Sequence, residues 1–428
     1  MAQIRANLSE TLGPIKPMHG VNQPPFEGTD FGMFHYLTEA GIPFSRTHDV
    51  GGFLGGGRFI DVPNLFRDFS ADPEDPASYD FTFTDLFITA LVEAEAEPFF
   101  RLGVTIENQA AIKAYRIYPP EDYQKWARIC EGIIRHYTEG WADGFRYDIR
   151  YWEIWNEPDN LPDRIQNMMW RGSPEQYYEL YEAASKHLKA RFPHLRIGGY
   201  ASCGFYALTR EAPLEHETYY LKFFEDFLAY IRAHDCPLDF FSWHSYSSVE
   251  DTMSWMGYVC GKLEEYGYGG VEQFLNEWNV EPANRGTARH AAMTAAMMLA
   301  AQDSPLTGAM FYDARLGTSI YGGLFNPLTR EPFPAYYAFQ AFNELYRRGT
   351  QLRVSSDTDG VYAAAATNGA GACVVIANTL DRAVPFHLEA EGAEEVLRCR
   401  ILDGTHPLTC CRLPDTLGPY TVLCVELE

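Results

Sequence analysis

The sequence lacks the cysteine spacings of zinc sites and redox motifs. It contains nine cysteines in 428 residues, an odd number, and no two of them are arranged as Cys-x-x-Cys. Disulfide frameworks and structural zinc sites usually show paired, regularly spaced cysteines. We therefore predict buried free thiols, which are typical of a reducing compartment.

The sequence also lacks the signature of a targeting or membrane segment. Residues 1–10 show no basic region followed by an apolar run, so they do not resemble a secretory signal. No apolar run is long enough to span a bilayer. Together with the free thiols, these features predict a cytoplasmic protein.

Basic side chains are scarce. Lysine and arginine number 34 against 58 aspartates and glutamates, which gives a formal net charge of −24. Nucleic acids and anionic membrane surfaces are bound through basic patches, so neither is an expected partner. An uncharged small molecule or oligosaccharide remains compatible with this charge, and homo-oligomerisation is left open.

Several catalytic motifs are missing. There is no Gly-x-Ser-x-Gly nucleophile elbow, no His-Glu-x-x-His zinc pair and no phosphate-binding loop. The glycine-rich stretch Gly51–Gly57 is not followed by Gly-Lys-Ser/Thr, and we interpret it as a mobile loop. It lies within His48–Asp85, a Gly-, Pro- and Asp-rich stretch predicted to be an active-site loop. No metal or cofactor is expected.

The chain alternates short apolar strands with amphipathic helices. The candidate strands number eight: Lys16–Gly20, Ile42–Arg46, Pro98–Gly103, Arg150–Trp155, Arg196–Tyr200, Asp239–Trp243, Gln273–Asn276 and Ala309–Tyr312. Such alternation implies parallel pairing, and eight units predict an α/β fold of the (β/α)8 TIM-barrel type. A doubly wound sheet is the alternative, but it usually carries a glycine-rich turn after strand one, which Met18–Asn22 lacks.

The pattern of apolar and polar residues changes after Arg348. Short alternating runs follow, separated by turn signals at Asn368-Gly369 and Asp403-Gly404, with no helical pattern between them. We predict a small C-terminal antiparallel β-sandwich. The expected division is a catalytic barrel over residues 16–348 and an accessory domain made of residues 1–15 plus 349–428.

Two apolar runs each end in Asn-Glu. Tyr151–Asp159 contains Glu157, and Gln273–Asn279 contains Glu277. The carboxyl ends of barrel strands meet at one face, so we expect these two carboxylates to face each other across one pocket. Cleavage of a glycosidic bond needs such a pair, which makes both residues catalytic candidates. Glu153 lies earlier on the same strand and is predicted to be a buried structural carboxylate with a partner.

Polar neighbours suggest supporting roles. The amide of Asn156 could bind a sugar hydroxyl beside the reacting carbon. His244 and Tyr246 share one face at the end of the sixth strand. A tyrosine hydroxyl there would hold Glu277 in place and keep it ionised.

Arg46 ends the second strand. A buried arginine is rare unless it is paired, so we predict pairing with Glu277, with Asp49 as the rival partner. Four further residues near strand ends are predicted to contact substrate: Asn22, His48, Tyr312 and Trp278, the last as either a stacking platform or a wall.

The stretch Trp152–Pro158 resembles the acid/base motif of clan A glycoside hydrolases, and within that clan it looks most like family 39, which holds β-xylosidases and α-L-iduronidases. The resemblance implies that Glu157 is the general acid/base and Glu277 the nucleophile of a retaining double displacement. It also implies that Asn156 binds the 2-hydroxyl and that Tyr246 supports the nucleophile. A barrel followed by a small β-sandwich fits the same family.

The second motif departs from that family. Many members have Thr-Glu followed by small residues, whereas this chain has Asn276–Asn279 around Glu277. Families 5 and 51 therefore stay open. The expected function is a retaining exo-glycosidase of β-xylosidase type acting on a neutral oligosaccharide or glycoside. The alternatives are an α-L-arabinofuranosidase, a β-glucosidase or β-galactosidase, an α-L-iduronidase-like enzyme, a transglycosylase, and a catalytically silent carbohydrate-binding barrel.

Overall fold

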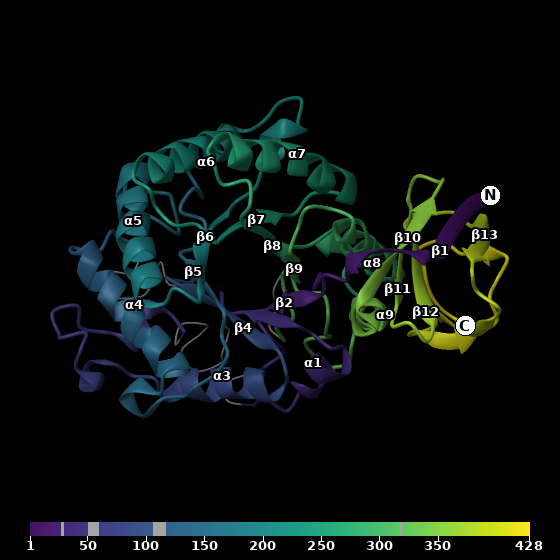
Figure 1. The fold of residues 1–428 in the computed structure, drawn as a ribbon, viewed down its shortest axis with the longest axis horizontal. Coiled ribbons are helices and arrows are strands. Elements are labelled where there is room, and N and C mark those ends of the chain that lie inside the picture. Colours follow the sequence, from purple (N-terminus) through teal and green to yellow (C-terminus); the bar gives the residue numbers. More distant parts are fainter. Residues whose placement is uncertain (27–29, 50–59, 106–116, 317–319) are drawn as a thin grey trace.

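The computed structural model describes residues 1–26, 30–49, 60–105, 117–316 and 320–428. Eight parallel strands form a closed barrel in chain order, which appears at the left and centre of Figure 1. They are β2 (Gly20–Asn22), β3 (Phe44–Arg46), β4 (Glu97–Leu102), β5 (Tyr151–Ile154), β6 (Arg196–Ser202), β7 (Phe240–Ser245), β8 (Glu272–Trp278) and β9 (Gly308–Phe311). The predicted (β/α)8 barrel is confirmed.

The first strand begins later than the sequence predicts. We expected Lys16–Gly20, whereas β2 starts at Gly20. Pro17 has no N–H for a strand ladder, and the backbone N–H of Lys16 is bound instead by the side chain of Gln302, at 2.9 Å. The chain therefore enters the barrel four residues later.

Helices surround the barrel (Figure 1). The longer ones are α3 (Thr82–Glu93), α4 (Tyr123–Thr138), α5 (Pro174–Arg191), α6 (Glu215–Ala233), α7 (Val249–Glu265), α8 (Ala288–Gln302) and α9 (Pro334–Arg348), and α1 (His35–Glu39) is a short one. Their ends are set by local chemistry: Ser173 and Gln176 form a capping box at α5, and the carboxylate of Asp122 caps α4. Among the described residues, no helix is both long and apolar enough to cross a membrane.

The predicted long loop is partly structured. The stretch His48–Asp85 contains helix α2 (Val62–Leu65) and the 3-10 turn η2 (Pro76–Ser78), and α3 begins at Thr82. Asp61 anchors it to β4, because its buried carboxylate accepts hydrogen bonds from Arg101 and Thr105 at 2.7 and 2.8 Å. The described part of this stretch is therefore not structureless, and its predicted role as an active-site loop stays a prediction. Gly51–Gly57 lies outside the described residues.

An aromatic plug closes the lower part of the barrel. It is formed by inward-facing residues of six strands: Phe44, Phe99, Tyr151, Phe240, Phe274 and Met310. On five of these strands a polar residue follows the plug residue two positions later: Arg46, Arg101, Glu153, Ser242 and Asn276. Because side chains on a strand alternate with a period of two, these polar residues form the next layer up inside the barrel.

The C-terminal region forms one curled nine-stranded sheet at the right of Figure 1. Its strands are β1 (Ala2–Pro14), β10 (Thr350–Ser356), β11 (Val361–Thr367), β12 (Ala372–Asn378), β13 (Val384–Glu391), β14 (Val396–Leu402), β15 (Thr409–Cys411), β16 (Thr416–Leu417) and β17 (Thr421–Leu427). The N-terminal strand β1 lies inside it, antiparallel to β10 and parallel to β13. The sandwich-like sheet predicted from the sequence is confirmed.

This sheet has two buried faces. One face holds a separate apolar core that includes Ile4, Leu352 and Val374. Residues of the other face, including Val375 and Ala377, belong to the main core of the barrel.

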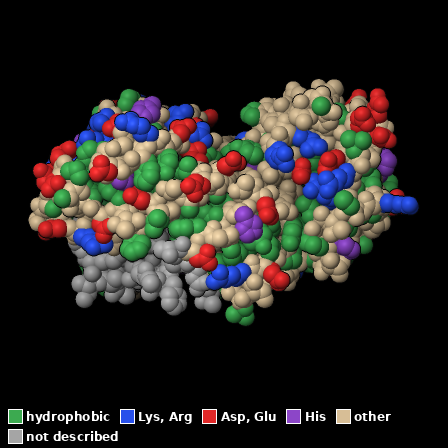
Figure 2. Space-filling model, turned by 90° about the horizontal axis from the view of Figure 1, so that it is seen from below, with side chains coloured by type: hydrophobic (Ala, Val, Ile, Leu, Met, Phe, Trp, Pro, Cys, Tyr) green, Lys and Arg blue, Asp and Glu red, His purple; other side chains and the backbone are tan. Residues whose placement is uncertain are grey.

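Acidic and basic side chains are interspersed on the face of the molecule that Figure 2 shows.

We expect Ile4→Ala to lower the free energy of unfolding by about 2–5 kcal/mol, because it removes a fully buried side chain from the core of the sheet. The neighbouring Arg5→Ala is the matched control. Its side chain is 65% exposed and pairs with Glu389 at 3.3 Å, so it should cost less than about 1 kcal/mol. Urea unfolding followed by circular dichroism measures both, and equal effects would show that β1 is not an integral strand of the sheet.

Candidate active site

Arg46 is the centre of the polar layer above the plug. Its guanidinium is fully buried and makes contacts in four directions. Nη1 donates to Glu277 Oε2 at 3.1 Å and to Asn22 Oδ1 at 3.2 Å, Nε donates to Glu153 Oε2 at 2.8 Å, and Nη2 donates to Asn156 Oδ1 at 2.6 Å. The predicted pairing with Glu277 is present, and Arg46 is itself covered by these partners.

Glu153 is a buried carboxylate with a full set of partners. Its Oε2 faces Arg46, and its Oε1 accepts from Ser242 Oγ at 2.6 Å and from Asn276 Nδ2 at 2.5 Å. These contacts come from β3, β7 and β8, so Glu153 ties three strands to β5. The structural role predicted for Glu153 is confirmed.

The backbone at the end of β5 is unusual. Trp155 and Glu157 have φ angles of 74° and 45°, in the left-handed region that residues with a side chain rarely adopt. Such conformations persist only when the surroundings fix them, and they cluster at functional sites. Here Trp155 Nε1 donates to the carbonyl of Met169 at 2.9 Å, and Glu157 N donates to the carbonyl of Ala201 at 3.0 Å. The turn aims the Glu157 side chain over the barrel.

Glu157 and Glu277 meet at His244. Nδ1 of His244 lies 2.8 Å from Glu157 Oε1, and its Nε2 lies 3.6 Å from Glu277 Oε2. One oxygen of each carboxylate and one ring nitrogen all lie within 4.8 Å of one another. Two strand-end carboxylates 120 residues apart in the sequence therefore share one small site.

The two carboxylates have different neighbours. Glu277 contacts the permanent cation Arg46 and accepts a hydrogen bond from Tyr246 Oη at 2.5 Å. Glu157 contacts only neutral donors among the described residues, with Asn160 Nδ2 at 3.1 Å from its Oε2. The contact that was predicted between Tyr246 and Glu277 is present in the structure.

Burial and charge act on the site in opposite directions. Burial raises the pKa of Glu277, whereas Arg46 and the Tyr246 hydroxyl lower it. Burial also raises the pKa of Glu157. Burial lowers the pKa of His244 to about 4, so its ring is neutral near pH 7 and carries a single proton. Both glutamates thus have a raised pKa, and only Glu277 is in direct contact with a cation that opposes the effect of burial.

Asn156 presents one free edge of its amide. Its Oδ1 accepts from Arg46, which fixes the orientation of the group. Its Nδ2 has no hydrogen-bond partner among the described residues and is not a fully enclosed atom. A donor held in this way next to Glu157 can bind an acceptor on a ligand.

Other predicted ligand contacts are placed differently. Asn22 is fully buried and donates to the carbonyl of Asn276 at 2.8 Å, so it supports Arg46 below the site. Trp278 is also fully buried, and its ring packs edge-on against Phe311 at 5.3 Å in the core. We correct the prediction for both: they act as support and core, because neither side chain reaches the open site.

His48 and Tyr312 form a polar wall with Asp49. His48 Nε2 lies 3.1 Å from Asp49 Oδ1, and Tyr312 Oη donates to Asp49 Oδ2 at 2.8 Å. Both side chains are almost completely buried. Burial and neighbouring arginines lower the pKa of His48, so it is neutral. Asp49, the rival predicted partner of Arg46, is bound by this wall instead.

Sequence reasoning missed the residues that support the two carboxylates. Ser242 and Asn276 bind Glu153, while Asp159 and Cys203 lie beside Glu157. The period of two along β7 could have indicated Ser242, which lies two residues before His244. Cys203 had no such signal, because its position depends on the turn after β6.

Among the described residues, Glu157, His244 and Glu277 form a cluster whose ligand atoms are spaced closely enough to hold a metal ion. The two carboxylates use opposite edges of the imidazole ring, Nδ1 and Nε2. Nδ1 is within hydrogen-bond distance of Glu157, whereas Nε2 has no hydrogen-bond partner among the described residues.

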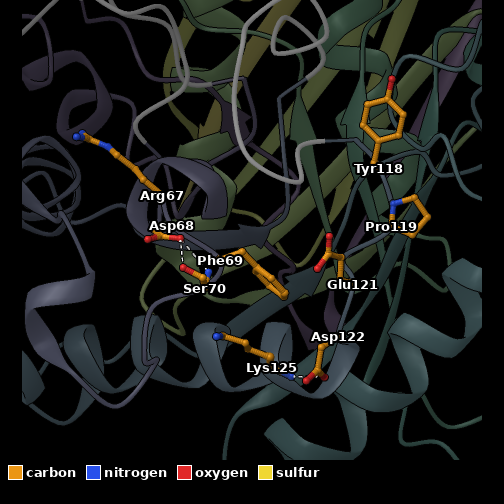
Figure 3. Close-up of a pocket in the computed structure, with 9 residues that line it drawn as sticks. All are labelled: Arg67, Asp68, Phe69, Ser70, Tyr118, Pro119, Glu121, Asp122 and Lys125. Carbon is orange, nitrogen blue, oxygen red and sulfur yellow. Dashed lines mark hydrogen bonds between the residues drawn. The ribbon is translucent and has the colours of Figure 1, made fainter.

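A separate hollow of about 710 Å³ lies near the start of α4 (Figure 3). Two of its three acidic groups already have structural partners: Asp68 accepts from Ser70, and Asp122 caps α4. None of its nine lining residues is among the described contacts of Glu157 or Glu277. We therefore place the functional site at the barrel and not in this hollow.

Comparisons with known proteins agree with this geometry. The family model for glycosyl hydrolases family 39 matches residues 49–262, half of the chain. A β-xylosidase from Geobacillus stearothermophilus is 26% identical over 357 residues, covering 73% of this chain and 66% of the relative. One from Caldicellulosiruptor saccharolyticus is 24% identical, covering 70% and 64%. The chain thus spans about two thirds of the length of these relatives.

Solved structures share the whole fold. A glucosidase from Croceicoccus marinus has a TM-score of 0.79 at 23% identity, covering 100% of this chain and 99% of that one. A family 39 β-xylosidase from Caulobacter crescentus has a TM-score of 0.70 at 18% identity, with the same coverage. The barrel and the sheet together therefore form a known architecture, and the resemblance to family 39 is confirmed.

We expect Arg46→Met to lower the free energy of unfolding by about 3–5 kcal/mol, because it leaves two buried carboxylates without their cation. Arg150→Met is the matched control. Arg150 pairs with Glu97 at 2.6 Å but is 52% exposed, so its loss should cost at most about 1 kcal/mol. Urea unfolding followed by tryptophan fluorescence separates the two, and equal losses would contradict the central role of Arg46.

Proposed function

Because the chain belongs to family 39 of the glycosyl hydrolases, we propose that it cleaves a glycosidic bond in a neutral glycoside or short oligosaccharide with retention of configuration. The observation that carries this proposal is the meeting of Glu157 and Glu277 within 4.8 Å at the ends of β5 and β8. Retaining enzymes place their two carboxyl groups about 5–5.5 Å apart, whereas inverting enzymes need about 6.5–9.5 Å.

Glu277 is the nucleophile in this proposal. An attacking carboxylate must be ionised, and Glu277 is the one that contacts Arg46 and the Tyr246 hydroxyl. Its oxygen forms a bond to the anomeric carbon while the bond to the leaving oxygen breaks. Arg46 and Tyr246 also hold the carboxylate in a fixed orientation for that attack.

Glu157 is the general acid and then the general base. Burial raises its pKa, and no permanent cation contacts it directly, so the protonated form is accessible. It gives its proton to the leaving oxygen in the first step. In the second step it takes a proton from water, which displaces Glu277 from the sugar. His244 Nδ1 fixes the carboxyl group throughout.

Asn156 completes the reacting centre. Its oriented Nδ2 would donate to the sugar 2-hydroxyl, a contact that strengthens as the ring flattens toward the transition state. His48 and Tyr312, held by Asp49, are proposed to contact the far side of the same sugar. The net charge of −24 favours a neutral sugar over an acidic one.

A β-xyloside is the preferred substrate, on the strength of the two β-xylosidase relatives. The likeness to a glucosidase structure makes a glucoside the second candidate. Residues 16–348 are proposed as the catalytic domain, and residues 1–15 with 349–428 as an accessory domain. A cytoplasmic location also stays a proposal, supported by nine cysteines that are all free thiols.

We expect wild-type protein to cleave one member of a nitrophenyl glycoside panel that includes β-xyloside, β-glucoside, β-galactoside, α-arabinosides and α-iduronide. Glu277→Ala should lower kcat/KM by about 10⁴-fold or more. Glu157→Ala should lower it by about 10²–10⁴-fold, the usual worth of acid–base catalysis. Chromogenic assays give both numbers.

Azide distinguishes the two roles. It should rescue Glu157→Ala with a product of retained anomeric configuration and Glu277→Ala with an inverted one. The same configuration from both variants would contradict the assignment. If the wild type cleaves no sugar but binds one, the chain is a carbohydrate-binding barrel, and excess transfer to an added alcohol would indicate a transglycosylase.

We expect Tyr246→Phe to move the acid limb of kcat/KM to higher pH by about one unit. The hydroxyl stabilises ionised Glu277 and lowers its pKa, so its removal raises that pKa, and less nucleophile is ionised at low pH. Tyr258→Phe is the matched control, since Tyr258 donates to a carboxylate, Glu225, at 2.7 Å outside the site. A pH profile in which both variants leave the limb unchanged would refute this role.

A further inference from the structure

Asp159 is a buried carboxylate that the proposed mechanism does not use. It lies two residues after Glu157 and is fully buried. Its Oδ2 accepts from Ser202 Oγ at 2.8 Å, and its two oxygens lie 3.2 and 3.3 Å from the backbone N–H of Cys203. No lysine, arginine or histidine forms an ion pair with it among the residues described. A charge on this carboxylate would therefore be expensive to bury.

Cys203 connects this carboxyl group to Glu157. Its backbone N–H donates to Asp159, and burial together with the charges of both carboxyl groups raises the pKa of its thiol. Asn160 Nδ2 also contacts both Glu157 Oε2, at 3.1 Å, and Cys203 Sγ, at 3.8 Å. Gly204 allows this packing, because at its φ of 120° an added Cβ would lie 2.7 Å from the carbonyl oxygen of His244.

We propose that Asp159 is a positioning residue that couples its own protonation to that of Glu157. When Glu157 gives its proton to the leaving group, Asp159 takes up one proton from solvent water. When Glu157 regains a proton from the attacking water, Asp159 releases that proton to solvent. The two buried carboxyls then carry one negative charge between them at both stages. This inference rests on the proposed acid/base role of Glu157.

Electrostatics near Asp159 support this coupling. Burial and then the charge of Glu157 raise the pKa of Asp159 to about 7, so while Glu157 is ionised Asp159 is mostly protonated below that pH. The titratable groups that face it from α5, β6 and α6 are Tyr177, Tyr178, Tyr200, Cys203, Tyr219 and Tyr220. Burial raises the pKa of each of these groups, so all are neutral and none supplies a counter-charge.

Other groups also face Glu157. They are His244, which is neutral, Glu277, whose charge acts on Glu157 in the same direction as that of Asp159, Cys203, and Arg46, whose direct contacts go to other residues. While Asp159 is ionised, its negative charge disfavours ionisation of Glu157. Part of the Glu157 population therefore stays protonated at alkaline pH. Removing the Asp159 charge should therefore make Glu157 lose its proton at lower pH.

Asp159→Asn is the direct test. It keeps the side-chain size and an acceptor for Ser202 and Cys203 but cannot ionise. We expect the alkaline limb of kcat/KM to move to lower pH by about one unit, which makes activity above the limb about tenfold lower, with the acid limb unchanged. A purely structural residue would lower kcat at all pH values without moving the limb, and that result would overturn the inference.

Ser202→Ala is a second variant with the same expected sign and a smaller shift. The Ser202 hydroxyl favours ionised Asp159, so its loss should raise the pKa of Asp159, keep this carboxyl neutral to higher pH and move the alkaline limb to lower pH by less than Asp159→Asn does. Infrared difference spectra give a readout that does not need turnover: the protonated carboxyl band that is lost as the pH rises should be lost at lower pH in Asp159→Asn than in wild type. An unchanged midpoint for the loss of this band would also overturn the inference.

The proposed function is tested separately. If Glu157→Ala is inactive and azide rescues it, while Asp159→Asn leaves both the limb and the band unchanged, only the coupling fails. If Glu157→Ala keeps full activity, the acid/base assignment itself fails and the coupling fails with it.

Discussion

The site depends on one buried cation. Arg46 lies above a plug of aromatic rings that excludes water, so its charge must be balanced by protein groups alone. Glu153 supplies one counter-charge and Glu277 the other. The guanidinium plane leaves little freedom in where these partners sit, because its donors point in fixed directions. The positions of Glu277 and Asn156 therefore follow from the need to balance the charge of Arg46 and to accept hydrogen bonds from its N–H groups.

The layers of side chains inside the barrel explain why the cation of Arg46 lies directly above the aromatic plug. Each strand alternates inward and outward, so an aromatic residue that closes the bottom is followed two positions later by a residue of the middle layer, such as Arg46 after Phe44. The middle layer is polar and is joined by hydrogen bonds around Arg46 and Glu153, and the residues at the strand ends form the open top. Glu153, within β5, belongs to the middle layer, and Glu157, just after the end of β5, belongs to the top.

The sequence predicted what depends on local pattern. Apolar runs that end in Asn-Glu located both carboxylates, and the alternation of strands and helices indicated the barrel. The prediction from sequence failed where a strand departs from regular pairing. A bulge near the end of β8 lies between Leu275 and Trp278, and the period of two does not say which face Trp278 takes after it. Asn22 was misjudged because β2 starts four residues later than predicted.

The two catalytic candidates differ because only one of them touches the cation. Arg46 fixes charge on Glu277, which a nucleophile requires, while Glu157 is bordered by neutral donors and by the carboxyl of Asp159. An acid that must become a base needs both protonation states to be accessible, and a permanent cation in contact would remove one of them. In the proposed coupling, the neighbouring carboxyl of Asp159 keeps both accessible. The asymmetry in charge across His244 is thus enough to separate two glutamates into two roles.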